Sequence, residues 1–404
     1  MGWDSWDTFG CGVDQHDVVQ AAEWLVASGL RDAGYRYVIV DDCWYNPTRG
    51  PDGSLRANAA KFPNGMRWLG WFLHSLGLRF GLYASAGTST CAQLNHIYPG
   101  ATGSQGHEQQ DARTFAAWGV DYLKYDYCSP DGSVWDQIAA FTRMRDALQA
   151  TGRPIVYSIN PNSFHATTGA RNWGAVANVV RVGEDLAPFW DTGALSDWYA
   201  GIVNAIAADA PLWHRAKPGI WNDPDSLVVG LQPAAYAAAV GSPSLAALLG
   251  SPPAPLHDDL SAQAMRTNFA MWAMLAAPLM IGADIPELTP AELRILRNPR
   301  LIAIDQDPLG RQGHPISPDG QVWVKPLSAG AVAVALLNST DAPLSLSTNA
   351  RRVGLPWASA YALTDLWTGA RRITRGGLAA LVPAHGTAVF ELAPLAGSAR
   401  RRRG

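Results

Sequence analysis

A lysine and an aspartate lie two residues apart in the apolar segment YLKYDYC, Tyr122–Cys128. If this segment is a β-strand, side-chain alternation places Tyr122, Lys124 and Asp126 on one face and the residues between them on the other. The two charges could form a structural ion pair. Such a pair inside a protein is weak evidence for stability, because desolvation offsets the attraction between the charges. A site that uses both groups for chemistry is the alternative.

Acids, amides and one arginine also occur at the ends of other predicted strands. The candidates are Asp41, Asp42, Tyr83, Ser85, Asn160, Arg181, Asp185, Asp223 and Asp225. Asp185 could instead cap a helix, and Asp223 with Asp225 could form a turn around the proline between them. Asp41 and Asp42 could bind a divalent ion or cap the next segment. Each structural role is plausible for a single residue, but all of them would have to apply at once, at the same end of the predicted strands. A shared active site explains the whole set more simply.

Short apolar segments alternate with amphipathic stretches from the start of the chain to about residue 308. The eight predicted strands are Met1–Trp6, Tyr37–Asp41, Phe80–Ser85, Tyr122–Asp126, Ile155–Asn160, Val179–Asp185, Gly219–Asp223 and Leu279–Asp284. Helices are predicted at Asp17–Ala33, Met66–Leu76, Glu108–Trp118, Val134–Ala150 and Ser261–Ala276. Eight such repeats predict an α/β fold of the (β/α)8 TIM-barrel type, with the active site at the carboxyl ends of its strands.

The pattern changes after about residue 310. Short alternating runs such as QVWVKPL, AVAVALLN and TAVFELAP, separated by turn residues, predict an antiparallel β-sandwich. We therefore expect a catalytic barrel over residues 1–308, a β-sandwich over 309–395 and a basic disordered tail over 396–404. The stretch Gln232–Asp258 is expected to be a loop or small helical insertion after the seventh strand.

The composition limits the classes of partner. A net charge of −3 over 404 residues argues against nucleic acid or a membrane surface, and no apolar run approaches the roughly 20 residues of a membrane span. The four cysteines include no CxxC pair, so no metal site is expected; two disulfides or four free thiols both fit the count. No signal peptide precedes the first motif, so we expect a cytoplasmic protein or one whose leader has been removed. The oligomeric state, monomer or homodimer, stays open.

Two carboxylates on different strands, without a Ser or Cys nucleophile motif, favour glycoside hydrolysis. The 17 tryptophans and 12 tyrosines suit a site that stacks on sugar rings, although most must be core. Two other classes remain. One is a non-catalytic carbohydrate-binding barrel, and the other is a metal-dependent lyase that uses Asp41 and Asp42 with Lys124.

Several long segments resemble glycoside hydrolase family 27, the family of α-galactosidases and α-N-acetylgalactosaminidases. They include MGWDSWDTFGC, YVIVDDCW, the stretch ending in YLKYDYC, WNDPD and NPRLIAIDQDPLG, and they run in the family's order from residue 1 to about 310. The resemblance implies a barrel followed by a β domain, a carbohydrate substrate, no cofactor and a retaining double displacement on terminal α-galactosyl residues. It also implies secretion, because the family carries two barrel disulfides, here Cys11–Cys43 and Cys91–Cys128.

The same resemblance assigns roles to single residues. Asp126 matches the nucleophile, and Asp185 matches the acid/base by its spacing from Arg181, with Glu184 as the competing candidate. The substrate-binding positions implied are Trp3 as an aromatic wall, Asp41 and Asp42 for the O4 and O6 hydroxyls, Lys124 and Arg181 as hydroxyl ligands, and Tyr83, Asn160 and Asp225 as pocket lining. We expect Lys124 to keep Asp126 ionised and a dry or anionic setting, with a contribution from Glu184, to keep Asp185 protonated.

The sequence also departs from the family pattern near the sugar. YSINPNSFH, which contains Asn160, replaces a Cys-Glu-Trp segment; Ser226 replaces a methionine after WNDPD; and Tyr127 replaces a small or amide residue after the nucleophile. The insertion at 232–258 is longer than expected. These changes leave a β-L-arabinopyranosidase or an isomaltodextranase-type activity open as alternatives within the family.

Overall fold

The computed structural model describes residues 1–128, 134–161, 173–193, 199–241 and 260–395. Within these residues, eight parallel strands form one sheet in the order β10-β1-β2-β3-β4-β5-β6-β9. Their bounds are β1 Gly2–Asp4, β2 Tyr37–Val40, β3 Arg79–Ser85, β4 Val120–Asp126, β5 Val156–Asn160, β6 Val179–Arg181, β9 Trp221–Asp223 and β10 Met280–Ile281. A parallel bridge between Leu227 and Ile281 joins the segment after β9 to β10 and closes the barrel. The predicted barrel is confirmed.

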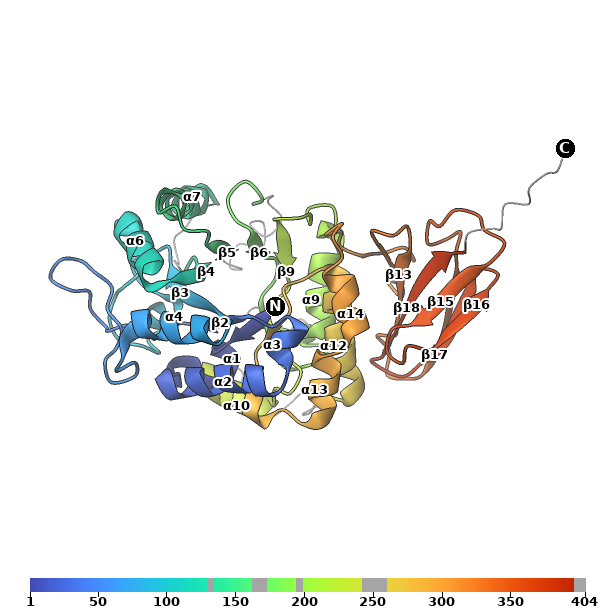
Figure 1. The fold of residues 1–404 in the computed structure, drawn as a ribbon, viewed down its shortest axis with the longest axis horizontal. Coiled ribbons are helices and arrows are strands. Elements are labelled where there is room, and N and C mark those ends of the chain that lie inside the picture. The colour runs from blue at the N-terminus through green and yellow to red at the C-terminus, as the bar shows by residue number, and fades with distance from the viewer. Residues whose placement is uncertain (129–133, 162–172, 194–198, 242–259, 396–404) are drawn as a thin grey trace.

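Helices cover the outside of the sheet (Figure 1). They are α1 Trp6–Phe9, α2 Gln15–Ala27, α3 Leu30–Ala33, α4 Gly65–Ser75, α5 Cys91–Leu94, α6 Glu108–Trp118, α7 Val134–Ala150, α9 Ile202–Asp209, α10 Pro233–Val240, α12 Ala262–Leu275, α13 Pro290–Leu296 and α14 Pro299–Asp305. The single helix predicted over Asp17–Ala33 is two helices, because Gly29 adopts a left-handed backbone with φ of 78° between them.

The sixth strand is shorter than the predicted Val179–Asp185. β6 ends at Arg181, which pairs with Asp223, the last residue of β9. Asp223 is followed by Pro224. Because proline has no backbone N–H, the ladder cannot continue there. Asp185 lies instead in a separate two-residue strand, β7 (Asp185–Leu186), which pairs in parallel with β8 (Tyr199–Ala200).

The two faces of β4 serve different layers, as alternation predicts. Leu123 and Tyr125 belong to the large apolar core that lies between the sheet and the helices. Tyr122 packs instead with Ile39, Val179 and Met280 in a small cluster within the barrel. Lys124 and Asp126, which follow Tyr122 on the same face, therefore project inward above this cluster, toward the carboxyl ends of the strands.

A β-sandwich follows the barrel and lies beside α12 and α14 (Figure 1). Its six-stranded sheet has the order β11-β12-β13-β18-β15-β16, and β14 pairs with β17 in a second sheet. The bounds are β11 His314–Pro315, β12 Val322–Pro326, β13 Val332–Leu337, β14 Leu344–Asn349, β15 Tyr361–Asp365, β16 Arg371–Thr374, β17 Gly377–Val382 and β18 Thr387–Pro394. All pairs in both sheets are antiparallel, which confirms the predicted sandwich.

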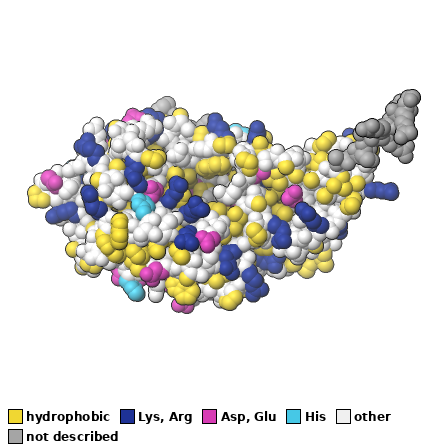
Figure 2. Space-filling model, viewed as in Figure 1, with side chains coloured by type: hydrophobic (Ala, Val, Ile, Leu, Met, Phe, Trp, Pro, Cys, Tyr) yellow, Lys and Arg dark blue, Asp and Glu magenta, His cyan; other side chains and the backbone are white. Residues whose placement is uncertain are grey.

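Two further features bear on the predictions made above. Helix α10 lies within the predicted insertion 232–258, whose remainder from 242 is outside the described residues. No helix among the described residues is long and apolar enough to cross a membrane. Basic side chains are spread over the face shown in Figure 2 rather than gathered in one patch.

Candidate active site

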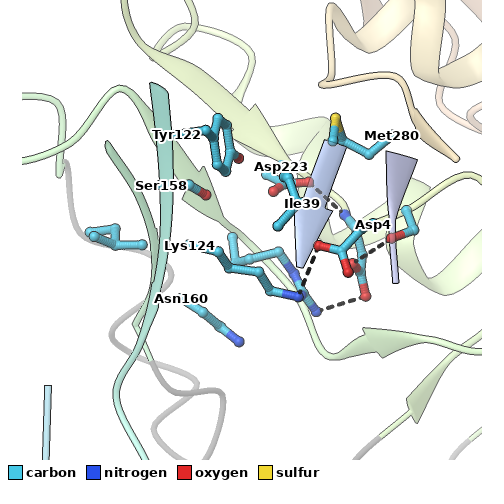
Figure 3. A pocket seen from close by; sticks show the side chains of 12 residues that line it. Asp4, Ile39, Tyr122, Lys124, Ser158, Asn160, Asp223 and Met280 are labelled. Carbon is cyan, nitrogen blue, oxygen red and sulfur yellow. Dashed lines mark hydrogen bonds and ion pairs between the residues drawn. The ribbon is translucent and has the colours of Figure 1, made fainter. Parts of the chain in front are cut away.

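The register of the barrel sheet brings the predicted polar residues to one rim. Lys124 pairs with Tyr83 on one side and Ser158 on the other, and Asp126 lies level with Asn160. A pocket opens above the apolar cluster at this rim (Figure 3). It is lined by Asp4, Ile39, Tyr122, Lys124, Ser158, Ile159, Asn160, Arg181, Asp223, Asp225, Ser226 and Met280.

Lys124 is held between two carboxylates. Its Nζ lies 2.7 Å from Oδ2 of Asp41 and 3.6 Å from Oδ2 of Asp4, and Figure 3 shows the ammonium group beside Asp4. Asp4 is a pocket residue that the sequence reasoning missed. It belongs to the predicted first strand, and applying alternation to that strand could have identified it, because Asp4 and Trp3 must face opposite ways.

The same alternation corrects the prediction for Trp3. Its side chain is fully buried, its indole N–H donates to the carbonyl of Ala283 at 3.0 Å, and its ring meets Phe9 edge-on at 6.1 Å. Trp3 therefore belongs to the core between the barrel and its helices and cannot be an aromatic wall for a sugar. The strand turns Asp4 toward the pocket in its place.

Asp41 and Asp42 follow β2, and both are buried. Asp41 pairs with Lys124, whereas Asp42 is held by the protein around it. One oxygen of Asp42 accepts from the Cys43 N–H and the Tyr45 hydroxyl, and the other accepts from the Ala92 N–H at 3.0 Å. Burial raises the pKa of Asp42 to about 7, although the Ala92 and Cys43 N–H groups act in the opposite direction.

Asp126 is buried at the end of β4 and is not among the residues that line the pocket. Among the described residues no hydrogen-bond partner reaches its Oδ1, while Oδ2 lies 3.4 Å from Sγ of Cys91. Burial raises the pKa of Asp126 to about 7, and the Lys124 ammonium lowers it by less than burial raises it. Lys124 therefore acts on Asp126 in the expected direction, but burial outweighs its effect.

Arg181 links Asp185 to Asp225, a residue that lines the pocket. Its NH2 group lies 2.9 Å from Oδ1 of Asp185 and 3.0 Å from Oδ2 of Asp225. The Asp185 side chain is 47% exposed and pairs with the Arg181 guanidinium. The choice of Asp185 over Glu184, made on its spacing of four residues from Arg181, stays a prediction.

Asp225 is fixed in a constrained backbone. Its φ is +82°, its N–H donates to Oδ1 of Asp223, and its carbonyl accepts from the Trp272 indole at 2.7 Å. Its Oδ2 also accepts from the Leu186 N–H at 2.8 Å. Asp225 therefore ties the pocket wall to the segment that carries Asp185.

Of the remaining residues that the sequence placed near the sugar, some line the pocket and others are buried away from it. Asn160 and Ser226 line the pocket. Tyr83 is buried beside Lys124, and its hydroxyl accepts from the Cys91 N–H at 3.3 Å. Tyr127 is turned away from the pocket and meets Phe141 edge-on at 5.9 Å, so its size adds to the core rather than to the site.

Both cysteine pairs are bonded as the resemblance implies, Cys11 to Cys43 and Cys91 to Cys128. The second bond fixes the residue that follows Tyr127, directly after the candidate nucleophile. Cys91, Asp126 and Cys128 lie close enough together to suggest metal ligands. Because the two sulfurs are bonded to each other, neither is a thiolate that could hold an ion.

Comparison with known proteins agrees with this arrangement. Residues 1–258 and 256–307 match the family described as α-galactosidase A, and residues 317–392 match the α-galactosidase C-terminal β-sandwich domain. The chain is 35% identical to α-galactosidase 3 of Arabidopsis thaliana, covering 98% of this chain and 81% of the relative. It is 32% identical to α-galactosidase A of Cellvibrio japonicus, covering 98% and 91%. The structure of the Saccharomyces cerevisiae α-galactosidase with raffinose superposes with a TM-score of 0.82 at 29% identity, covering 98% and 97%. The chain therefore belongs to the α-galactosidase family of glycoside hydrolases, family 27.

Proposed function

We propose that this protein removes terminal α-D-galactosyl residues from oligo- or polysaccharides by a retaining double displacement. The observation that carries the proposal is the rim itself. Asp126 ends β4 at this rim, level with the pocket residue Asn160, and Arg181 pairs with both Asp185 and the pocket residue Asp225. The relatives named above, α-galactosidases by name, support the choice of sugar.

In the first step, a carboxylate oxygen of Asp126 attacks the anomeric carbon. The bond between that carbon and the departing oxygen breaks, and the departing oxygen takes a proton from Asp185. In the second step, Asp185 removes a proton from water, the water oxygen bonds to the anomeric carbon, and Asp126 leaves as a carboxylate. Two inversions give net retention.

The ionisation states that this sequence needs depend on substrate binding. Asp126 must be ionised to attack, and Lys124 and Arg181 favour its charged form. Asp185 must carry a proton, and its side chain is half exposed. A sugar in the pocket would cover Asp185 and exclude water from it, which favours the neutral acid.

The other pocket groups would orient the sugar by hydrogen bonds to its hydroxyls. Lys124 and Arg181 offer donors, and Asp41 and Asp225 offer acceptors that are already partly satisfied by these cations. Asp42 has both oxygens bonded to protein donors, so a hydroxyl would have to share them. The two disulfides suit an oxidising compartment, and we propose that the protein works outside the cytoplasm.

A panel of 4-nitrophenyl glycosides tests the proposal. We expect the α-galactoside to be cleaved with a higher kcat/KM than the α-N-acetylgalactosaminide, the β-L-arabinopyranoside or the α-glucoside, and EDTA to leave the rate unchanged. The isosteric variant Asp126→Asn is the matched control and should lose nearly all activity. Preference for the β-L-arabinopyranoside, or loss of activity in EDTA, would contradict the proposal.

A further inference from the structure

An aromatic stack joins the β-sandwich to the loop that carries Asp185. The rings of Trp190 and His385 are nearly parallel, at an interplanar angle of 15°, with centroids 4.4 Å apart. Trp190 is five residues after Asp185, and His385 lies between β17 and β18 of the other domain. The two rings are therefore a direct contact between the sandwich and the segment of the proposed acid/base residue.

This segment lies outside the barrel sheet, so the barrel ladder does not position it. It contributes only the two-residue strand β7, and the Asp185 side chain is half exposed. The residues that follow, from Leu186 to Trp190, are buried. The Phe189 and Trp190 carbonyls accept from the N–H groups of Ile202 and Val203 at the start of α9. The buried residues after Asp185 therefore help to place the acid, together with the contacts that Arg181 and Asp225 make to this segment.

His385 is itself held firmly on the sandwich side. Its ring nitrogen Nε2 lies 2.8 Å from Oδ1 of Asp341, and its backbone carbonyl accepts from the Thr267 hydroxyl of α12 at 2.8 Å. Thr267 also accepts from the hydroxyl of Thr387, which begins β18. The His385 backbone has a φ of +55°, an uncommon conformation for a residue with a side chain. A strained turn tied to both domains thus presents the ring to Trp190.

We propose that His385 is a positioning residue for acid catalysis: through its stack on Trp190, the β-sandwich holds the segment that places Asp185 at the departing oxygen. This inference rests on the proposed function and gives the sandwich a part in the reaction. It requires no contact between the sandwich and the substrate.

The consequence depends on the leaving group. When the leaving group is a second sugar, Asp185 must protonate the glycosidic oxygen as its bond to the anomeric carbon breaks. Dinitrophenolate, in contrast, leaves as a stable anion without a proton. A misplaced Asp185 therefore slows the first substrate and spares the second. Because kcat/KM reports the steps up to the first bond cleavage, it isolates this effect from the later action of Asp185 as a base.

The test compares kcat/KM on a galactosyl disaccharide with kcat/KM on 2,4-dinitrophenyl α-galactoside. His385→Asn removes the ring, and asparagine tolerates a positive φ. We expect a loss of about threefold to tenfold on the disaccharide, the range that an aromatic pair supports, and a change of less than about twofold on the activated substrate. His385→Phe keeps a flat ring and should restore the disaccharide rate.

Equal losses on both substrates, or no loss on either, would overturn the inference, because a merely structural role does not distinguish leaving groups. If His385→Asn does not fold, Trp190→Phe reduces the overlap of the rings from the barrel side, and its effect should have the same leaving-group dependence. Failure of the proposed function itself would be seen separately, as a wild-type enzyme that cleaves neither galactoside.

Discussion

Replacing Lys124 by methionine would remove the cation between Asp4 and Asp41. The Lys124 side chain is 19% exposed and that of Asp41 only 3%, with 2.7 Å between Nζ and Oδ2, so solvent screens this pair weakly. Breaking a buried pair by removing one partner typically costs about 3–5 kcal/mol, because the remaining charge is left uncompensated. We expect Lys124→Met to lower the free energy of unfolding by about this amount at pH 8.

The loss should depend on pH in a defined direction. Lys124 lowers the pKa values of Asp4 and Asp126, which burial raises to about 7. Without Lys124 both pKa values rise further, so the folded variant takes up protons that the unfolded chain has released. The stability deficit of the variant should therefore be larger at pH 8 than at pH 5.5.

Urea unfolding followed by tryptophan fluorescence measures the difference. The matched control is Arg143→Met, which breaks the Arg143–Glu108 pair, where the arginine is 51% exposed; its cost should stay below about 1 kcal/mol. The double variant Lys124→Met/Asp41→Asn should recover part of the loss, because it also removes the orphaned charge. A Lys124→Met protein within 1 kcal/mol of wild type at pH 8 would refute the reasoning.

Three further predictions follow from the positions of single groups. Because Trp3 is a core residue, Trp3→Ala should lower the free energy of unfolding in urea by about 3–5 kcal/mol. The galactose inhibition constant of the folded enzyme should not change. A large rise in that constant would show that Trp3 contacts the sugar. Tyr127→Phe, which keeps the ring beside Phe141, should not alter the ratio of rates across the nitrophenyl panel; a change in that ratio would place Tyr127 near the sugar. The wild-type melting temperature should decrease as the pH rises from 5.5 to 8. In this range folded Asp42 and Asp126, with pKa values of about 7, lose protons that the unfolded chain has already lost. A melting temperature that increases with pH would contradict these pKa shifts.

Local patterns in the sequence predict much of the fold. Alternation along YLKYDYC places Lys124 and Asp126 inward and Leu123 outward, as observed. Gly34, Gly77 and Gly119 each follow a helical stretch of the sequence, where a left-handed cap is expected, and each has a positive φ in the structure. These features depend on residues near in sequence, which is why periodicity detects them.

Features that depend on distant partners were not predictable in the same way. β6 stops at Arg181 because its neighbour in the sheet reaches Pro224, some forty residues further along the chain. The balance between burial and Lys124 at Asp126 likewise requires the packed site. The edge strand β16 was missed because its sequence, Arg371–Thr374, is charged and exposed and lacks an apolar face.

The central claim, that Asp126 is the nucleophile of a retaining α-galactosidase, is tested most directly by chemical rescue. Asp126→Gly should be nearly inactive on an activated α-galactoside, and sodium azide should restore turnover by attacking the anomeric carbon from the space that the carboxylate occupied. Nuclear magnetic resonance of the product should then show β-galactosyl azide, the product of a single inversion. α-Galactosyl azide, or free galactose at an undiminished rate without azide, would contradict the assignment.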